Sequence, residues 1–222
     1  MRKVFIGTPC YDGKIDVWYA NSLIQTERIA REQNIEIIPI YMSYDSLVQR
    51  ARNDCVHLAL EMGCDDIVWI DADIEWRPEW FFQLLNYDVD IVGGTYRKKS
   101  DNSESYVVSI KNELLPDKQG LMSVSGLGCG FTRFSKKAIQ YLWNNSEPYT
   151  ENGEPESKRM IFDVRVKNGE LISEDIVVCD KLKQGGFDIW LDPHMTCNHT
   201  GIKKFQGNFK NWYSSLRNNV EF

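Results

Sequence analysis

The chain has 222 residues, 42% of them hydrophobic, which is enough for one domain with a sizeable core. Its formal net charge of -6 and its sequence pI near 5.2 argue against a protein that binds nucleic acid by broad phosphate neutralisation. We therefore expect a single domain over residues 1–222 and no nucleic-acid partner, with phosphate groups bound only locally.

The N-terminal residues and the cysteines indicate the compartment. The apolar run in MRKVFIGTPCYDG is broken by Gly7 and Pro9, so it is too short for a secretion signal or a membrane span. The six cysteines include no C-x-x-C pair, which favours free thiols over disulfides or structural zinc. We expect a cytoplasmic protein without a membrane span.

Strand-like and helix-like segments alternate through the first half of the chain. Short apolar or alternating runs predict strands, and apolar residues at helical spacing predict amphipathic helices between them. Asp45 or Ser46 is expected to cap the second helix, which should end near Gly63. The predicted strands are 4–6, 35–41, 67–70 and 90–94, and the predicted helices are about 17–32, 47–62 and 80–85.

The second half is less regular. A polar stretch begins near residue 100 and contains one predicted edge strand at 106–110. Glycines crowd residues 126–130, where the backbone can turn sharply or approach a ligand closely. The remaining predicted elements are a helix over about 136–143, a mobile loop over 147–158, a helix over 174–184 between Ser173 and Gly185, and a last strand at 189–191.

Two aspartates, Asp71 and Asp73, directly follow the apolar strand 67–70. Open α/β sheets bind ligands at the carboxyl ends of their strands, so the pair is expected at such a site. In extended backbone, residues i and i+2 point the same way, so the two carboxylates should converge on one cation. Oxygen ligands with open positions suit Mg²⁺ or Mn²⁺ bridging a diphosphate. The simpler alternative is that the aspartates only cap the next helix or accept loop N–H groups.

The chain resembles glycosyltransferases of the GT-A fold, in which a strand ending in D-x-D binds the metal of a nucleotide-sugar. The resemblance extends over nearly the whole chain and lies in the order and spacing of its motifs. It is similar in pattern to small transferases of viral or bacterial origin, which is consistent with a virus-encoded protein in a host cell. The motifs are Gly7-Thr8-Pro9, Arg52-Asn53, VWIDADIEWRP, DIVGGTYRKK, GLGCGF, SEDIVVCDKLKQGG and NHTG.

The resemblance implies a single-domain, Rossmann-like α/β fold with a central, mostly parallel sheet flanked by helices. Residues 1–99 would form the nucleotide-binding half, and residues 100–222 the half for the donor sugar and the acceptor. The implied activity is metal-dependent transfer of a sugar from a nucleotide-sugar, with UDP favoured, to a hydroxyl of a glycan or another acceptor. Neither the sugar nor the oligomeric state follows from the sequence.

The same resemblance implies the metal ligands. Asp73 would bind the metal directly, and Asp71 would contact the ribose or sugar of the donor and support the metal shell. His199, with Gly201 close behind it, would complete the site, and His194 is its nearest competitor. Imidazole nitrogen suits Mn²⁺ better than Mg²⁺, so manganese is the expected cofactor. The alternative is that His199 is an ordinary loop histidine.

Glu174 and Asp175 form a second carboxylate pair. An acceptor hydroxyl loses its proton as it attacks the sugar, so a carboxylate across the sugar from the diphosphate can act as general base. Inverting members of the fold use the second residue of such a pair, which implies Asp175 as the base. Alternatively, both acids only face the dipole at the helix N-terminus. Retaining enzymes with a similar motif pattern need no such base.

The resemblance also implies a pocket for the donor. Residues at the end of the first strand and at the start of the second helix would surround the base and ribose. Either basic cluster, 97–99 or 203–204, could offset the diphosphate charge, or both could be plain solvated surface. The implied donor-binding residues are Thr8, Pro9, Tyr11, Arg52, Asn53, Asp71, Ala72, Asp73, Gly128 and Lys203.

Three other classes of protein remain open. A sugar nucleotidyltransferase also holds Mg²⁺ on paired aspartates, but GTPCYDGK lacks the glycine-rich basic loop that usually follows its first strand. A haloacid-dehalogenase-type phosphatase carries its D-x-D on the first strand, whereas Asp71 and Asp73 follow the third predicted one. A sugar-binding module without catalysis would have no need of Asp175 and His199.

Overall fold

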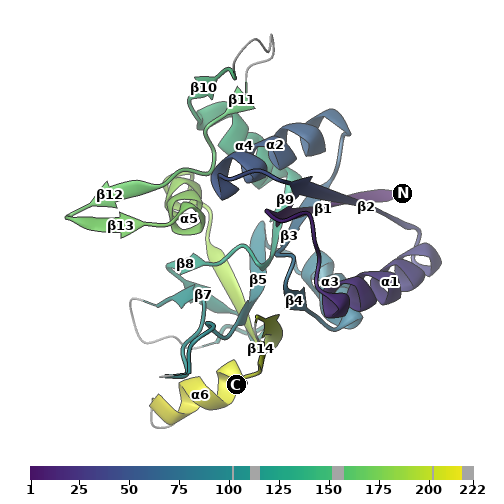
Figure 1. Cartoon of the computed structure of the whole chain (residues 1–222), viewed down its shortest axis with the longest axis vertical. Helices are drawn as coiled ribbons and strands as arrows, with labels where there is room; N and C mark the ends of the chain where they lie inside the picture. Colours follow the sequence, from purple (N-terminus) through teal and green to yellow (C-terminus); the bar gives the residue numbers. More distant parts are fainter. Residues whose placement is uncertain (102, 111–115, 152–157, 202, 217–222) are drawn as a thin grey trace.

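The computed structural model describes residues 1–101, 103–110, 116–151, 158–201 and 203–216, and its centre is a mixed β-sheet (Figure 1). The strands of this sheet are β1 Arg2–Cys10, β2 Ile35–Ser43, β3 Asp66–Ile70, β4 Ile74–Glu75, β5 Ile91–Tyr96, β7 Met122–Val124, β9 Phe131–Ser135, β14 Ile189–Thr200 and β15 Lys204–Phe205. The helices are α1 Val17–Glu32, α2 Val48–Glu61, α3 Pro78–Asn86, α4 Lys136–Asn145, α5 Glu174–Gln184 and α6 Phe209–Leu216.

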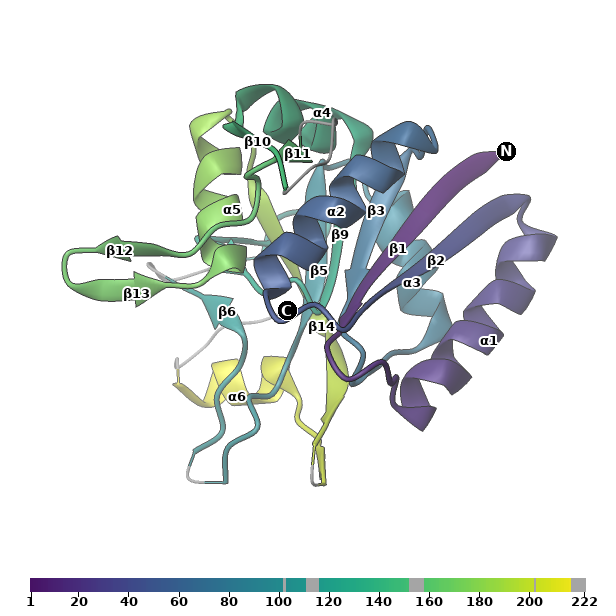
Figure 2. The same ribbon diagram turned by 45° about the horizontal axis from the view of Figure 1, so that its top comes forward.

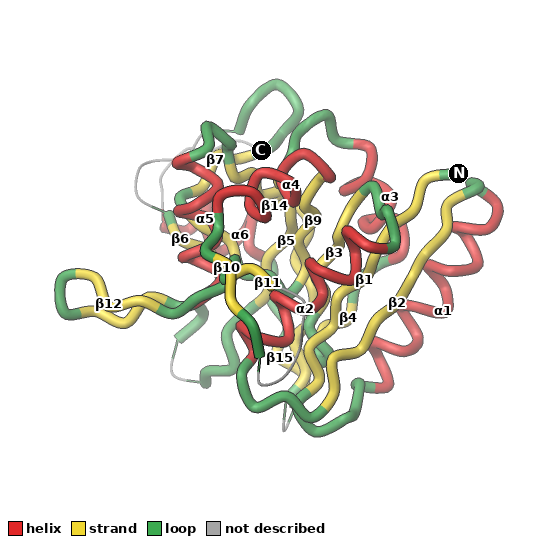
Figure 3. Tube along the Cα trace, turned by 90° about the horizontal axis from the view of Figure 1, so that it is seen from above, coloured by secondary structure: helices red, strands yellow, loops and turns green. Residues whose placement is uncertain are grey.

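The main row of strands runs in the order β15-β14-β5-β9-β3-β1-β2, and β4 and β7 pair with β14 outside that row. Strand β1 pairs in parallel with both β2 and β3, and β5 pairs in parallel with β14. Strand β9 runs antiparallel between β3 and β5. Seen from above, β2, β1, β3, β9 and β5 lie side by side with helices on both sides (Figure 3). The predicted α/β fold with a central, mostly parallel sheet flanked by helices is confirmed.

The two faces of the sheet build two separate cores, because successive strand residues point to opposite faces. In β3, Ile67 and Trp69 pack with α2, α4 and α5, whereas Val68 and Ile70 pack with α1 and α3. Figure 2 shows α2 over one side of the central strands and α1 and α3 over the other. All five residues of β3 are buried, as its unbroken apolar pattern predicts for a central strand.

The five predicted helices are confirmed, but the predicted cap of α2 is wrong. Neither Asp45 nor Ser46 caps α2, whose N-cap is Leu47 without a side-chain bond. Asp45 instead accepts a hydrogen bond from Leu47 N at 2.9 Å and forms an ion pair with Arg50. Ser173 occupies the N-cap position of α5, yet its hydroxyl donates to Asp175 rather than accepting from the helix backbone.

Three strands differ from the prediction. Strand β1 continues through Gly7 to Cys10. Gly7 lets the Trp69 ring pack directly against the β1 backbone, since a Cβ at this position would lie 2.7 Å from that ring. Strand β14 continues past Pro193 because its register with β5 shifts between Leu191 and Thr196. Strand β9 was not predicted at all, because it carries the charged residue Arg133 at its centre.

Short strand pairs lie outside the main sheet. They are β6 Val108–Ser109 with β8 Gly126–Leu127, β10 Pro148–Tyr149 with β11 Lys158–Arg159, and β12 Arg165–Lys167 with β13 Glu170–Ile172. The predicted edge strand at 106–110 is therefore reduced to β6. Of the predicted mobile stretch 147–158, residues 152–157 lie outside the described residues, and the remainder contains β10 and the start of β11. The β12–β13 hairpin projects from the rest of the molecule (Figure 1).

All six cysteines are buried and unpaired, as their spacing predicts. None of the helices in the described part of the chain has both the length and the apolar character that a membrane crossing requires. The aromatic segment near the end of the described chain seals the core, since Phe209 and Tyr213 of α6 are buried and Phe209 meets Tyr106 edge to face.

A buried carboxylate fixes β9 in the middle of the sheet. Asp66 is 1% exposed and accepts hydrogen bonds from Arg133 and Arg2, each at 2.7 Å. Arg133 also donates to the carbonyls of Tyr87 and Val89. Buried charges are tolerated only when paired in this way, so the three side chains depend on one another.

We predict that Asp66→Asn lowers the free energy of unfolding by about 3–5 kcal/mol, because it leaves two arginines without their counter-charge. Urea denaturation followed by circular dichroism measures the change. The matched control is Asp88→Asn, an exposed aspartate whose replacement should change stability by less than about 0.5 kcal/mol. A similar small loss for both variants would contradict the structural role of Asp66.

Candidate functional site

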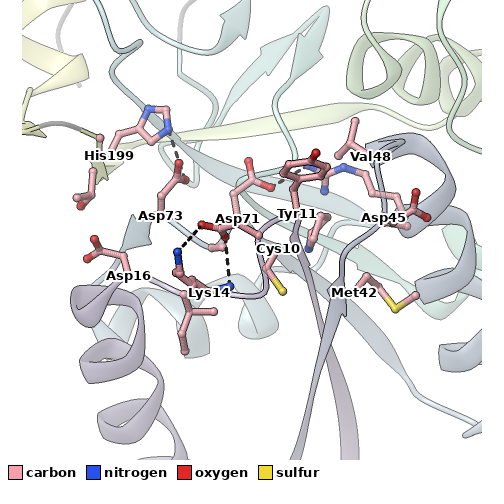
Figure 4. Close-up of a pocket in the computed structure, with 18 of the residues that line it drawn as sticks. Cys10, Tyr11, Lys14, Asp16, Met42, Asp45, Val48, Asp71, Asp73 and His199 are labelled. Carbon is pink, nitrogen blue, oxygen red and sulfur yellow. Dashed lines mark hydrogen bonds and ion pairs between the residues drawn. The ribbon is translucent and has the colours of Figure 1, made fainter.

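A cavity of about 890 Å³ opens at the carboxyl ends of β1, β2 and β3. The segments that follow these strands form its walls, together with the start of α2, the start of α5 and the end of β14. Figure 4 shows Tyr11, Asp71, Asp73 and His199 at this cavity. Open α/β sheets bind ligands at the carboxyl ends of their parallel strands, and the D-x-D motif was expected at this cavity for that reason.

Asp71 and Asp73 both line the cavity, but their carboxylates have separate partners. The backbone turns after β3, with Ile74 N donating to Asp71 O at 3.0 Å. Asp71 accepts from Arg52 at 2.8 Å, whereas Asp73 faces His199 and Lys99. The chain forms a turn here rather than the extended strand that the prediction assumed, so in this structure each carboxylate contacts its own basic partners.

Asp73 lies between two basic side chains. The Lys99 ammonium contacts Asp73 Oδ2. His199 Nε2 lies 3.5 Å from Asp73 Oδ1 (Figure 4). Burial by itself would raise the pKa of Asp73, but hydrogen bonds from His199 and Lys99 outweigh burial and hold that pKa below its usual value. Asp73 is therefore an ionised carboxylate at neutral pH.

His199 is held in an orientation that suits metal binding. Its Nδ1 lies 2.9 Å from the carbonyl oxygen of Arg97, and its ring meets Tyr96 edge to face. A carbonyl only accepts, so Nδ1 carries a hydrogen, and Nε2 is the ring nitrogen that faces Asp73. His194, the competing candidate, is exposed and does not line this cavity.

The donor set at Asp73 and His199 fits a divalent cation with open positions for a ligand. Within the described residues, however, no group of three or more histidine, cysteine or acidic side chains is assembled for a metal. Asp71 is held by Arg52, so the three-residue set predicted from the sequence is not preformed. Two candidate ligands, Asp73 and His199, face the cavity.

Arg52 is a buried cation beneath the acidic wall. Its guanidinium is 2.8 Å from Asp71, 3.7 Å from Glu174 and stacked near the rings of Trp69 and Phe162. Burial opposes its charge, but the neighbouring Asp71 foremost keeps the pKa of Arg52 above its usual value. Arg52 thus joins α2, β3 and α5 at the cavity.

Of the second carboxylate pair, Glu174 faces the cavity and Asp175 does not. Burial raises the pKa of Glu174, although the adjacent Arg52 pulls it down. Asp175 accepts a hydrogen bond from Ser173 beside the start of α5. The structure therefore brings the residue before the predicted base, rather than the predicted base itself, to the cavity.

Several predicted donor-binding residues do line the cavity. They are Pro9, Tyr11, Arg52, Asp71, Ala72 and Asp73. Thr8 and Asn53 do not. The Thr8 hydroxyl is buried 2.7 Å from Tyr19 Oη, and the Asn53 side chain bonds the backbone of Ile161 and Phe162. Both residues have structural partners that the resemblance could not reveal.

Gly128 and Lys203 are also placed elsewhere. A Cβ at Gly128 would lie 2.4 Å from Val107 and 2.9 Å from Tyr96 Oη, so this glycine makes room for protein side chains rather than for a ligand. The Lys203 ammonium pairs with Asp101 at 2.5 Å and lies over the Phe205 ring, outside the cavity lining.

Other cavity residues had no sequence signal of their own. Thr200 lines the cavity, and its buried hydroxyl has no hydrogen-bond partner among the described residues. Among the described residues of the lining, six carboxylates oppose three permanently cationic side chains. The carboxylates are Asp12, Asp16, Asp45, Asp71, Asp73 and Glu174, and the cations are Lys14, Arg52 and Lys99.

Among solved structures, the chain resembles A197 from STIV, with a TM-score of 0.60 and 18% identity over 90% of this chain and 86% of that one. This match shows that the two chains share a fold. No model of a protein family and no curated protein matches the sequence.

Two further solved structures match with TM-scores below 0.5, at which similarity carries no weight for function. One is a glycosyltransferase involved in glycosylation of the major capsid of PBCV-1, with a TM-score of 0.36 and 10% identity over 63% of each chain. The other is the inositol-1-phosphate CTP transferase from T. maritima, with a TM-score of 0.45 and 10% identity over 100% of this chain and 98% of that one.

Because the pKa of Glu174 is raised in the folded state, the stability of the protein should depend on pH. The folded state holds this proton more tightly than the unfolded state, so stability is greatest below the usual glutamate range and falls as the pH rises through the folded pKa. Glutamine mimics the protonated form. We predict that Glu174→Gln raises the midpoint of thermal unfolding at pH 7.5 by about 2–4 °C.

This advantage should vanish below about pH 4, where glutamate is protonated in both states. Differential scanning calorimetry across this pH range measures it. The control is Glu170→Gln in the exposed β13 strand, which should change little at either pH. A lower midpoint for Glu174→Gln at pH 7.5 would show that its ion pair with Arg52 outweighs the cost of burial.

Proposed function

We propose that this protein is a metal-dependent glycosyltransferase that moves a sugar from a nucleotide-sugar to a hydroxyl of a glycan or another acceptor. The observation that carries the proposal is a cavity with a net negative lining in which Asp73 and His199 form an open, oxygen- and nitrogen-bearing corner. A diphosphate would be repelled by such a lining unless a cation accompanied it.

Asp73 and His199 are the residues that would hold the cation, with Mn²⁺ favoured by the imidazole nitrogen. A bound divalent cation would neutralise charge that develops on the diphosphate as the sugar leaves. Tyr11 and Pro9, after β1, would lie beside the base and ribose. Asp71, 29% exposed and fixed by Arg52, would accept hydrogen bonds from donor hydroxyls.

Glu174 is proposed as the proton acceptor for the attacking hydroxyl. It lines the same cavity as Asp73, and its raised pKa makes it a better base than an ordinary carboxylate. Direct attack aided by such a base inverts the anomeric centre, so inversion is the proposed outcome. The proposal differs from the sequence prediction, in which Asp175 is the base.

The activity is tested with a panel of UDP- and GDP-sugars and Mn²⁺, scoring release of nucleoside diphosphate with and without EDTA. We expect release with at least one donor, its loss with EDTA, and its loss in Asp73→Asn. The surface variant Asp88→Asn is the control. Pyrophosphate release from a nucleoside triphosphate and a sugar phosphate, with no turnover of any nucleotide-sugar, would instead identify a nucleotidyltransferase.

The choice of base is tested by comparing Glu174→Gln with Asp175→Asn once a donor is known. Loss of the base should lower kcat by about two or more orders of magnitude with little change in donor affinity. We expect this for Glu174→Gln and a smaller effect for Asp175→Asn. The reverse order would return the role to Asp175, and a product with retained anomeric configuration would remove the need for either.

A further inference from the structure

Both oxygens of the Asp73 carboxylate are engaged in the described structure. Lys99 Nζ contacts Oδ2, and His199 Nε2 faces Oδ1 from 3.5 Å. A divalent cation that binds this carboxylate needs at least one of these oxygens. Lys99 and a cation bound beside His199 would therefore share one carboxylate and repel each other across it.

The Lys99 side chain has room to change its contact partner while it stays in the cavity. Its side chain follows β5, lines the cavity and is 36% exposed. Its stem passes Gly201, where a Cβ would lie 3.2 Å from Lys99 Cδ, so the glycine leaves room for the lysine chain. A lysine ammonium is a compact charge on a flexible four-carbon stem, so it can change partners while its backbone stays in place.

The other cations near this corner are committed or distant. Arg52 is buried and held by Asp71, and Lys203 pairs with Asp101 outside the lining. Lys204 donates to Glu75 at 2.6 Å and lies over the Trp18 ring. Lys14 does line the cavity, but its side chain is 80% exposed and lies 3.6 Å from Asp12. Within the described residues, Lys99 is the cation in direct contact with the proposed metal ligand.

We propose that Lys99 is an exchangeable counter-ion of the site. In the free protein the Lys99 ammonium neutralises the Asp73 carboxylate. With a divalent cation bound at Asp73, the ammonium would instead contact the diphosphate of the bound nucleotide. This inference rests on the proposed function, because it needs a cation and a diphosphate to bind in this cavity. Of the two basic clusters that the sequence left open for the phosphate contact, it selects the one that contains Lys99 rather than Lys203.

The exchange predicts effects of opposite sign on two ligands. Removing the ammonium should make Mn²⁺ alone bind more tightly, because no ammonium then repels the cation across the carboxylate. The same change should weaken the nucleoside diphosphate in the presence of Mn²⁺, because a charged hydrogen bond to phosphate is lost. A lysine that only shapes the site would weaken both ligands or neither.

The test measures binding to the intact chain rather than catalysis. Isothermal titration calorimetry gives the affinity for Mn²⁺ alone, and then for UDP and GDP at saturating Mn²⁺, in wild type and Lys99→Met. We expect Mn²⁺ to bind about two- to fivefold more tightly in Lys99→Met, on the scale of a partly exposed ion pair. The preferred nucleotide should bind about tenfold more weakly. Lys98→Met, an exposed lysine next to it, is the matched control and should change neither.

The other outcomes overturn the inference in distinguishable ways. If wild type binds Mn²⁺ and nucleotide but Lys99→Met alters neither, or weakens both, Lys99 is not an exchanging cation and the proposed function stands. If nucleotide binds without Mn²⁺ and is lost in Lys99→Met, the lysine replaces the metal rather than yielding to it. If wild type binds neither ligand, the inference and the proposed function fail together.

Discussion

The cavity depends on one buried positive charge, the guanidinium of Arg52. It contacts the carboxylates of Asp71 and Glu174 from below and is covered by the rings of Trp69 and Phe162. These groups come from distant parts of the chain, and two carboxylates on one wall would repel each other without the cation between them. A buried charge is tolerated only with its partners, so the position of α5 relative to β3 and the composition of the wall constrain each other.

Much of the fold could be predicted from the sequence where local pattern and tertiary structure agree. Strand β3 is apolar throughout because both faces are buried, and α1 and α5 show helical spacing with clear ends. The pattern failed for β9, whose Arg133 contradicts a buried strand until Asp66 is known to be its neighbour. Such pairing joins residues 67 positions apart, and no local window contains both.

The site was predicted in part for the same reason. Position after parallel strands was enough to bring Tyr11, Asp71 and Asp73 to one cavity. It was not enough to fix where each side chain points, because a single turn after β3 sends the two aspartates to different partners. Motif order also could not show whether Lys99 or Lys203 lines the cavity. Both are polar loop residues, and each forms an ion pair with a residue far away in the sequence, Asp73 and Asp101 respectively.

The placement of β9 also bears on how the chain acquires its structure. Strands β3 and β5 are separated by only 20 residues in sequence, yet they are held apart by a strand that is synthesised about 40 residues later. A nascent chain that has reached the end of β5 thus leaves the backbone of one edge of β3 and one edge of β5 without the strand that pairs with both. Contacts of such long sequence separation slow folding. Until β9 is present, the unpaired edges of β3 and β5 can pair with a strand of another chain.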